Sequence, residues 1–164
     1  MRRKQVVIIG SGDDIENLSI SYDIGRFIAR NKWVLITGGR GGIMEAASQG
    51  ASEEEGLVVG ILPGIHHDDA NTHCGIVIPT GVGYARNMIN VLSGDVIIAI
   101  GGKSGTLSEL AYSWQFGKPI ILCTFAGGWS EKISHEPIDD RYRDLFFPAS
   151  NLNEVFSHLK KILE

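Results

Sequence analysis

The sequence predicts an α/β protein with a doubly wound, mostly parallel sheet that is flanked by helices. Short apolar runs rich in β-branched residues recur along the chain, and helical patterns separate most of them. The runs are continuously hydrophobic, without alternation of apolar and polar residues, which is typical of strands covered on both faces in a parallel sheet. Alternation of such strands with helices favours right-handed βαβ units.

Each apolar run has the length of one strand, and the expected strands are residues 5–9, 34–37, 57–62, 76–79, 96–100 and 120–124. Apolar residues at helical spacing predict helices over residues 17–31, 43–54, 84–92, 106–116 and 151–163. Gly117 would end the fourth helix, and Asn151 or Asn153 would cap the fifth. The polar stretch 126–142 is expected to be a surface loop with a short helical turn.

Length and composition limit the classes of protein and partner. The chain has 164 residues, which is enough for one domain with a core, and we expect a single domain over residues 1–164. The net charge is −4 and no basic stripe appears, so we expect no nucleic-acid partner. No apolar run approaches the length of a membrane span, and the two cysteines are expected to be free thiols. These features predict a cytoplasmic protein without a membrane partner.

Glycine is the main departure from ordinary composition, with 21 residues that gather at the ends of apolar runs. Three glycine loops follow the first, second and fifth expected strands. In an open parallel sheet these loops share the edge where ligands bind, and a helix start beside such a loop favours phosphate. The residues expected to hold phosphate are Gly10, Ser11, Gly38, Gly39, Arg40, Gly42, Gly101, Gly102, Lys103, Ser104, Gly105 and Thr106.

The loops do not match two familiar nucleotide-binding motifs. The segment from Gly10 to Ile15 lacks the third glycine of the dinucleotide fingerprint, and the second strand ends in Thr37 where an acidic residue is expected. The phosphate-loop pattern with Gly-Lys-Ser or Gly-Lys-Thr is absent as well. Hydride transfer and nucleoside triphosphate hydrolysis are therefore disfavoured.

Glu109 has two interpretations. Thr106 and Glu109 have the spacing of a capping box, in which Thr106 caps the helix and Glu109 reaches back to the cap N–H. Glu109 also faces the expected ligand edge, where a carboxylate could act chemically. Both interpretations remain open from the sequence.

Arg86 stands at the expected start of the third helix, next to Asn87. A cation there opposes the helix dipole, which favours negative charge at that end. This placement suggests that Arg86 is paired with an anion, either a ligand or Glu109, although a solvated arginine is the alternative. We expect Arg86 and Asn87 to belong to the ligand site.

Three segments together resemble a known family. Residues 37–44, 80–87 and 101–109 are similar to the Rossmann-like "lysine decarboxylase-like" superfamily, which includes the cytokinin-activating phosphoribohydrolases known as LOG proteins. Within it the chain most resembles the short branch that contains molybdenum cofactor carrier proteins. The similarity extends from the first strand to about Cys123.

The resemblance implies a nucleotide-type site with specific departures. The LOG motifs are an Arg-Lys pair and Pro-Gly-Gly-x-Gly-Thr-x-x-Glu. Arg86 matches the arginine, and Gly102, Gly105, Thr106 and Glu109 match the second motif. Three positions depart from the pattern, because Asn87 replaces the lysine, Gly101 the proline and Lys103 the second glycine.

The resemblance leaves three functions open. A carrier would hold a phosphate-bearing ligand, with the molybdenum cofactor as possible cargo and no resident cofactor required; Asn87 and Lys103 favour this reading. A phosphoribohydrolase would cleave the N-glycosidic bond of a nucleoside 5′-monophosphate, with Glu109 and Arg86 as catalytic residues. A nucleotide-sensing regulatory protein is the third. The resemblance also implies a homodimer or homotetramer.

A polar loop carries His66 and His67, with two aspartates, His73 and Cys74 nearby. Consecutive side chains in an irregular loop seldom converge on a metal without a partner pair on a rigid element. We therefore expect no metal site. Whether this loop closes over the ligand stays open.

Overall fold

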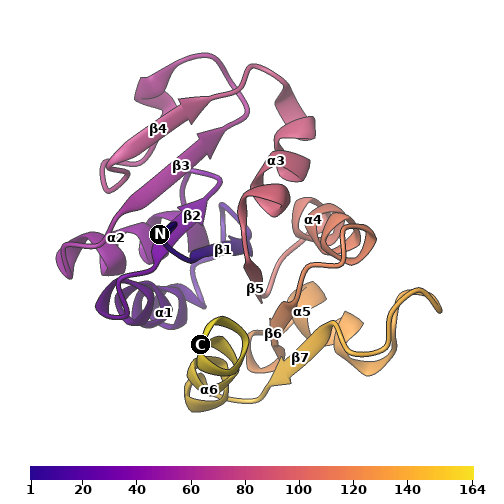
Figure 1. Ribbon diagram of the computed structural model, residues 1–164. Helices are drawn as coiled ribbons and strands as arrows, with labels where there is room; N and C mark the ends of the chain where they lie inside the picture. The colour runs from indigo at the N-terminus through magenta and orange to yellow at the C-terminus, as the bar shows by residue number, and fades with distance from the viewer.

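A computed structural model describes residues 1–164 and confirms the expected fold class. Seven strands form one sheet in the order β4-β3-β2-β1-β5-β6-β7, and every neighbouring pair is parallel (Figure 1). The strands are β1 (Gln5–Gly10), β2 (Val34–Thr37), β3 (Val58–Leu62), β4 (Ile76–Pro79), β5 (Val96–Ile100), β6 (Ile120–Cys123) and β7 (Phe146–Ala149). The central strands β2 and β5 are buried along their whole length, as their continuous hydrophobicity predicts.

Helices cover both faces of the sheet (Figure 1). They are α1 (Leu18–Arg30), α2 (Ile43–Glu53), α3 (Arg86–Ser93), α4 (Ser104–Gln115), α5 (Gly128–Lys132) and α6 (Leu152–Leu163). Residues of α1, α2 and α6 share one hydrophobic cluster with one side of the strands. Residues of α3, α4 and the segment around α5 share a second cluster with the other side. The molecule is thus a three-layer helix–sheet–helix arrangement.

The order of the strands reverses between β1 and β5. Chain connections run outward from β1 through β2, β3 and β4, and then return to β5 on the other side of β1. Val6 pairs with Val96 and Gly10 with Ile100, so the two strands end together at the same edge. Ligands in open α/β sheets bind outside the carboxyl ends of the strands at such a switch point. The fold therefore directs attention to the loops after β1 and β5.

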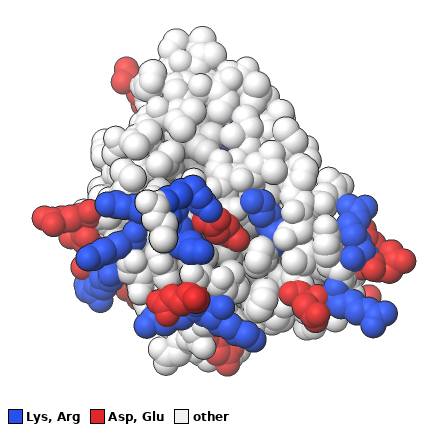
Figure 2. All heavy atoms as spheres, viewed as in Figure 1, with Lys and Arg blue, Asp and Glu red and all other residues white.

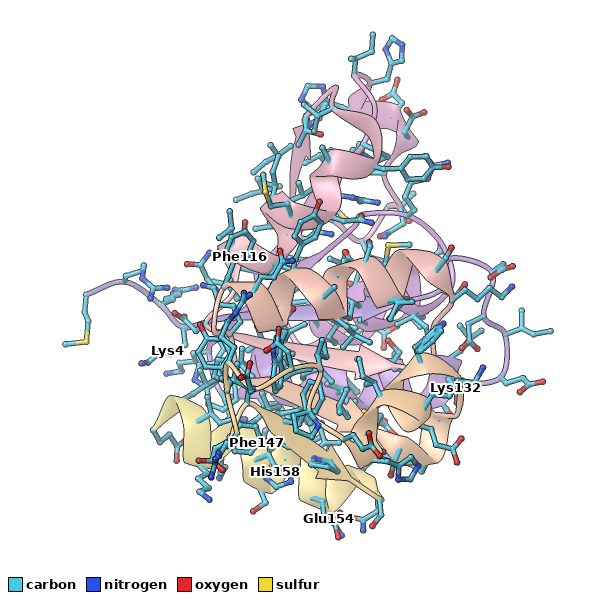
Figure 3. The ribbon with its side chains drawn as sticks, turned by 90° about the vertical axis from the view of Figure 1, so that its right-hand side faces the viewer. Lys4, Phe116, Lys132, Phe147, Glu154 and His158 are labelled. Atoms are coloured by element: carbon cyan, nitrogen blue, oxygen red, sulfur yellow. The ribbon has the colours of Figure 1, made fainter.

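The structure adds one strand that the sequence analysis missed. β7 is a four-residue edge strand that contains Pro148, and proline lowers strand propensity but is tolerated at an edge. Phe147 of β7 lies against His158 of α6, with ring centroids 5.6 Å apart (Figure 3). The expected short helical turn in the 126–142 stretch corresponds to α5.

Helix boundaries agree at one end of the chain and differ near the site. Asn151 caps α6, because its side-chain oxygen accepts a hydrogen bond from the Glu154 N–H at 3.1 Å. The fourth expected helix begins earlier than predicted, since α4 starts at Ser104 with Lys103 in the N-cap position. α3 starts at Arg86 after a short 3₁₀ turn over Gly83–Ala85.

Charge is mixed on the face shown in Figure 2. Lys and Arg are interspersed with Asp and Glu over its lower part, whereas the upper part, over β3, β4 and α3, carries few charged side chains. No helix combines the length and the apolar composition that a membrane span requires.

Candidate functional site

A cavity of about 200 Å³ lies at the switch point of the sheet. Residues 10–12 at the end of β1 form one wall, Arg86 and Asn87 of α3 a second, and the start of α4 a third. The complete lining is Ile8, Ile9, Gly10, Ser11, Gly12, Gly38, Met44, Tyr84, Arg86, Asn87, Asn90, Lys103, Gly105, Thr106 and Glu109. Segments far apart in the sequence therefore meet at the edge where the glycine loops were predicted to converge.

Two glycines allow the loops to approach each other. Gly102 has a φ of +101°, and a Cβ there would collide with the Thr106 side chain at the start of α4. Gly42 has a φ of +57°, and a Cβ would collide with the backbone of Ser11 and Gly12. Both positions favour glycine for backbone conformation and for space. The close approach of the loops thus explains part of the glycine content.

Glu109 does not form the predicted capping box. α4 begins at Ser104, so Glu109 lies in its second turn, and no side chain caps the helix N-terminus. The Glu109 carboxylate instead accepts a hydrogen bond at Oε1 from Asn90 Nδ2, 3.1 Å away on α3. The capping interpretation was therefore wrong, and the carboxylate faces the cavity.

Burial controls the protonation of Glu109. The residue is 7 % exposed, and loss of solvation raises the pKa of its carboxyl group from 4.5 to about 7. The hydrogen bond from Asn90 and the positive charge of Arg86 act in the opposite direction. A carboxyl group with a pKa near neutrality can hold or accept a proton at physiological pH.

Arg86 links the ends of two strands and also lines the cavity. Its Nη1 donates hydrogen bonds of 2.6 Å to the backbone carbonyls of Gly38 and Ile61, and its Nε contacts Asn87 Oδ1 at 3.3 Å. Burial lowers the pKa of Arg86, and the nearby Glu109 carboxylate partly opposes this shift. No hydrogen bond or ion pair joins Arg86 to Glu109 directly. The Nη2 group has no protein partner and is not sealed from solvent, so it can contact a ligand.

Lys103 lines the cavity and forms an ion pair with Asp13, which lies outside the cavity lining. Its Nζ lies 2.6 Å from Asp13 Oδ2, which connects the loop after β5 to the loop after β1. This ion pair is the main reason that the pKa of Asp13 is lowered. The two side chains are 70 % and 68 % exposed, so the pair is open to competition from solvent ions and ligands.

The expected phosphate residues divide among neighbouring hollows. Gly10, Ser11, Gly38, Arg86, Asn87, Lys103, Gly105 and Thr106 line the cavity at the switch point. Gly101 and Gly102 line an adjacent hollow of about 330 Å³ on the other side of Lys103. Gly42 lines a hollow of about 420 Å³ between α1 and α2. Gly39, Arg40 and Ser104 do not contribute to the lining of the switch-point cavity.

Asn90 lines the cavity and is a residue that the sequence analysis did not identify. It is 1 % exposed and follows Arg86 by four residues, so both side chains lie on the same side of α3. The four-residue spacing from Arg86 is the sequence signal that could have identified Asn90. His66 and His67 do not line the cavity, and no group of three or more His, Cys, Asp or Glu side chains gathers as a metal site.

Comparison with known proteins shows the family to which the chain belongs. A family model described as the SLOG cluster4 family matches residues 3–155. The chain belongs to this family. The match confirms the LOG-like superfamily resemblance that the glycine loops, Arg86 and Glu109 predicted.

Solved structures of similar proteins agree with this placement near the carrier branch. A molybdenum cofactor binding protein from Rippkaea orientalis is 38% identical, with 100% of this chain and 99% of that chain covered and a TM-score of 0.89. The molybdenum cofactor carrier protein from Chlamydomonas reinhardtii is 32% identical, with 99% of each chain covered and a TM-score of 0.87.

A hydrolase is also similar to this SLOG cluster4 chain. The cytokinin riboside 5′-monophosphate phosphoribohydrolase of Mycobacterium tuberculosis is 29% identical over 116 residues, which are 65% of this chain and 62% of the hydrolase. The chain thus spans less than two thirds of that relative.

Proposed function

We propose that this SLOG cluster4 protein binds a phosphate-bearing small molecule in the switch-point cavity and acts as a molybdenum cofactor carrier-like protein. The observation that carries the proposal is the convergence of Gly10 to Gly12, Arg86 and the N-terminus of α4 on one cavity. Backbone N–H groups at a helix start and a guanidinium group favour an anion. The similar proteins from Rippkaea and Chlamydomonas support the cofactor as cargo.

The residues at the cavity suggest how the cargo phosphate is held. The N-terminal amides of α4 around Gly105 and Thr106 would donate to phosphate oxygens, with Arg86 Nη2 and Lys103 supplying positive charge. Lys103 would exchange its ion pair with Asp13 for contact with the phosphate. No bond in the cargo changes in this scheme, so the protein's role is to bind and release.

The direct test is binding of molybdenum cofactor to the purified protein, followed by gel filtration and pterin fluorescence of the protein fraction. The variant Arg86→Ala should retain less cofactor, while Lys161→Ala, an exposed cation on α6, should retain as much as the wild type. Retention by none of the three proteins would refute the carrier proposal.

A second candidate function is N-glycosidic hydrolysis of a nucleoside 5′-monophosphate. The observation that favours it is Glu109, a buried carboxyl group with a pKa of about 7 in the same cavity as Arg86. Such a group could orient water or stabilise an oxocarbenium-like ribosyl centre. The similar hydrolase from Mycobacterium supports this candidate.

Base release decides between the two candidates. Nucleoside 5′-monophosphates are incubated with the wild type and with Glu109→Gln, and free base is measured by chromatography. Release that depends on Glu109 would make the protein a phosphoribohydrolase despite Asn87. Absence of release, together with cofactor binding, would favour the carrier. Binding of nucleotide without cofactor retention or release would favour a nucleotide sensor.

The proposal includes a homodimer or homotetramer. Tyr84 lines the cavity and is nevertheless 95 % exposed, and Phe116 at the end of α4 is 40 % exposed (Figure 3). A second chain packed against these side chains would cover them. Analytical ultracentrifugation measures the assembly, and a monomer at micromolar concentration would contradict it.

A further inference from the structure

The inner wall of the cavity contains one unsatisfied polar atom. Asn90 is 1 % exposed, and its Oδ1 is the only buried side-chain nitrogen or oxygen atom without a hydrogen-bond partner. Leaving such an atom without a partner costs about 1–3 kcal/mol. Because buried polar atoms are normally satisfied, this exception needs an explanation.

Above the Glu109 pKa of about 7, the ionised carboxylate fixes the orientation of the Asn90 amide. An ionised Glu109 can only accept hydrogen bonds, so the donor end of the amide, Nδ2, faces Glu109 Oε1 at 3.1 Å. The acceptor end is then left without a protein donor. Asn90 and Glu109 both line the cavity.

Glu109 adds a second acceptor at the same wall. Only its Oε1 receives a protein hydrogen bond, and Oε2 receives none. The wall thus presents two acceptors on adjacent helices, α3 and α4, without a protein donor to satisfy them. Asn87 is different, because its Nδ2 donates to Ser108 Oγ and its Oδ1 accepts from Arg86 Nε.

We propose that Asn90 Oδ1, together with Glu109 Oε2, accepts hydrogen bonds from O–H or N–H donors on the non-phosphate part of the ligand, so that Asn90 is a specificity-determining residue. This inference rests on the proposed function, because it assumes that a phosphate-bearing ligand occupies the cavity. Phosphate groups at the mouth would position the ligand, and the inner acceptors would select its donors. The hydroxyls of a ribose and the N–H groups of a pterin share this chemistry.

The test measures the affinities of three probes: AMP, 2′,3′-dideoxyadenosine monophosphate and a phosphorylated pterin. Each probe is titrated calorimetrically into the wild type, Asn90→Leu and Asn87→Leu. Chromatography of the same samples measures how much nucleotide has been cleaved. If ribose hydroxyls are the donors, the wild type binds AMP about tenfold more tightly than the dideoxy analogue. Asn90→Leu should reduce this preference, with Glu109 Oε2 as the remaining acceptor. Asn87→Leu should keep the preference, whatever its overall affinity.

The other results are equally decisive. If pterin N–H groups are the donors, Asn90→Leu weakens pterin binding about tenfold and leaves the two nucleotides alike. Should Asn90→Leu not fold, Asn90→Thr retains a donor toward Glu109 and places a methyl group near the position of Oδ1. Unchanged affinities for all three probes in a folded Asn90 variant would overturn the inference alone. Failure of the wild type to bind any probe would overturn the proposed function and the inference with it.

Discussion

Lys103 Nζ lies 2.6 Å from Asp13 Oδ2, and this exposed ion pair joins the two loops that flank the cavity. The lysine stands where the LOG motif has a glycine, so the pair is a feature of this chain's own loop sequence. The positive charge of Lys103 is paired with the Asp13 carboxylate. Binding of a phosphate to Lys103 therefore competes with Asp13.

We predict that Asp13→Asn strengthens binding of phosphate-bearing ligands. The substitution removes the carboxylate that competes for Lys103, and because the pair is exposed the gain should be about twofold to fivefold. Lys103→Ala should weaken binding by a similar factor. Both effects should shrink at high salt, since exposed charges are screened. Titration of AMP at two salt concentrations measures them.

Asp144→Asn is the matched control for Asp13→Asn. It changes the net charge equally, and Asp144 is exposed and does not line the cavity. Its affinity should equal that of the wild type. Equal gains in both variants would show that overall charge, not the ion pair with Lys103, limits binding.

We predict that Arg86 contributes to both stability and binding. Arg86→Ala leaves the carbonyls of Gly38 and Ile61 without their donor, so the free energy of unfolding should fall by about 2 kcal/mol. Arg86→Lys keeps the positive charge but not the planar fork of donors, so it should recover ligand affinity better than stability. Urea denaturation and AMP titration measure the two quantities. Unchanged affinity in folded Arg86→Ala would remove Arg86 from the site.

Much of the fold could be predicted, because each central strand is a continuous apolar run that needs no context to recognise. β7 could not, since four residues with a proline become a strand only when β6 offers an edge. The site likewise contains features that local sequence predicts and features that depend on tertiary packing. Glycine loops and Arg86 are visible as local patterns, whereas the bond between Asn90 and Glu109 depends on how α3 packs against α4. The capping box failed because the backbone places Lys103, not Thr106, at the helix start.

We predict a pH-dependent stability difference between the wild type and Glu109→Gln. The folded-state pKa of Glu109 is about 7, above its ordinary value of 4.5, so the folded protein holds a proton that the unfolded chain has lost between these values. The wild type therefore loses stability as pH rises from about 4.5 to 7, by about 3 kcal/mol from this group. Glu109→Gln lacks this loss. Its free energy of unfolding should therefore rise relative to that of the wild type between pH 4.5 and 7, and the difference should stay constant above pH 7.

Urea denaturation at pH 5 and pH 8 checks this prediction. Glu136→Gln, a change at an exposed position, is the control and should follow the wild type at both pH values. A difference between Glu109→Gln and the wild type that is the same at pH 5 and pH 8 would contradict the raised pKa of Glu109.

We predict that Gly105→Ala separates ligand binding from stability. Gly105 is the second residue of α4, and a Cβ there would meet no atom within 4 Å. Alanine has a higher helix propensity than glycine, so the free energy of unfolding should be unchanged or raised by about 0.5 kcal/mol. The added methyl group would project into open space beside the cavity, where the proposed phosphate lies, and ligand affinity should fall about tenfold. Gly75→Ala is the control, because its added methyl group would make only an ordinary van der Waals contact and Gly75 lies outside the cavity lining. The ligand affinity of this variant should match that of the wild type. If Gly105→Ala binds AMP and the molybdenum cofactor as well as the wild type does, the phosphate does not lie at the start of α4.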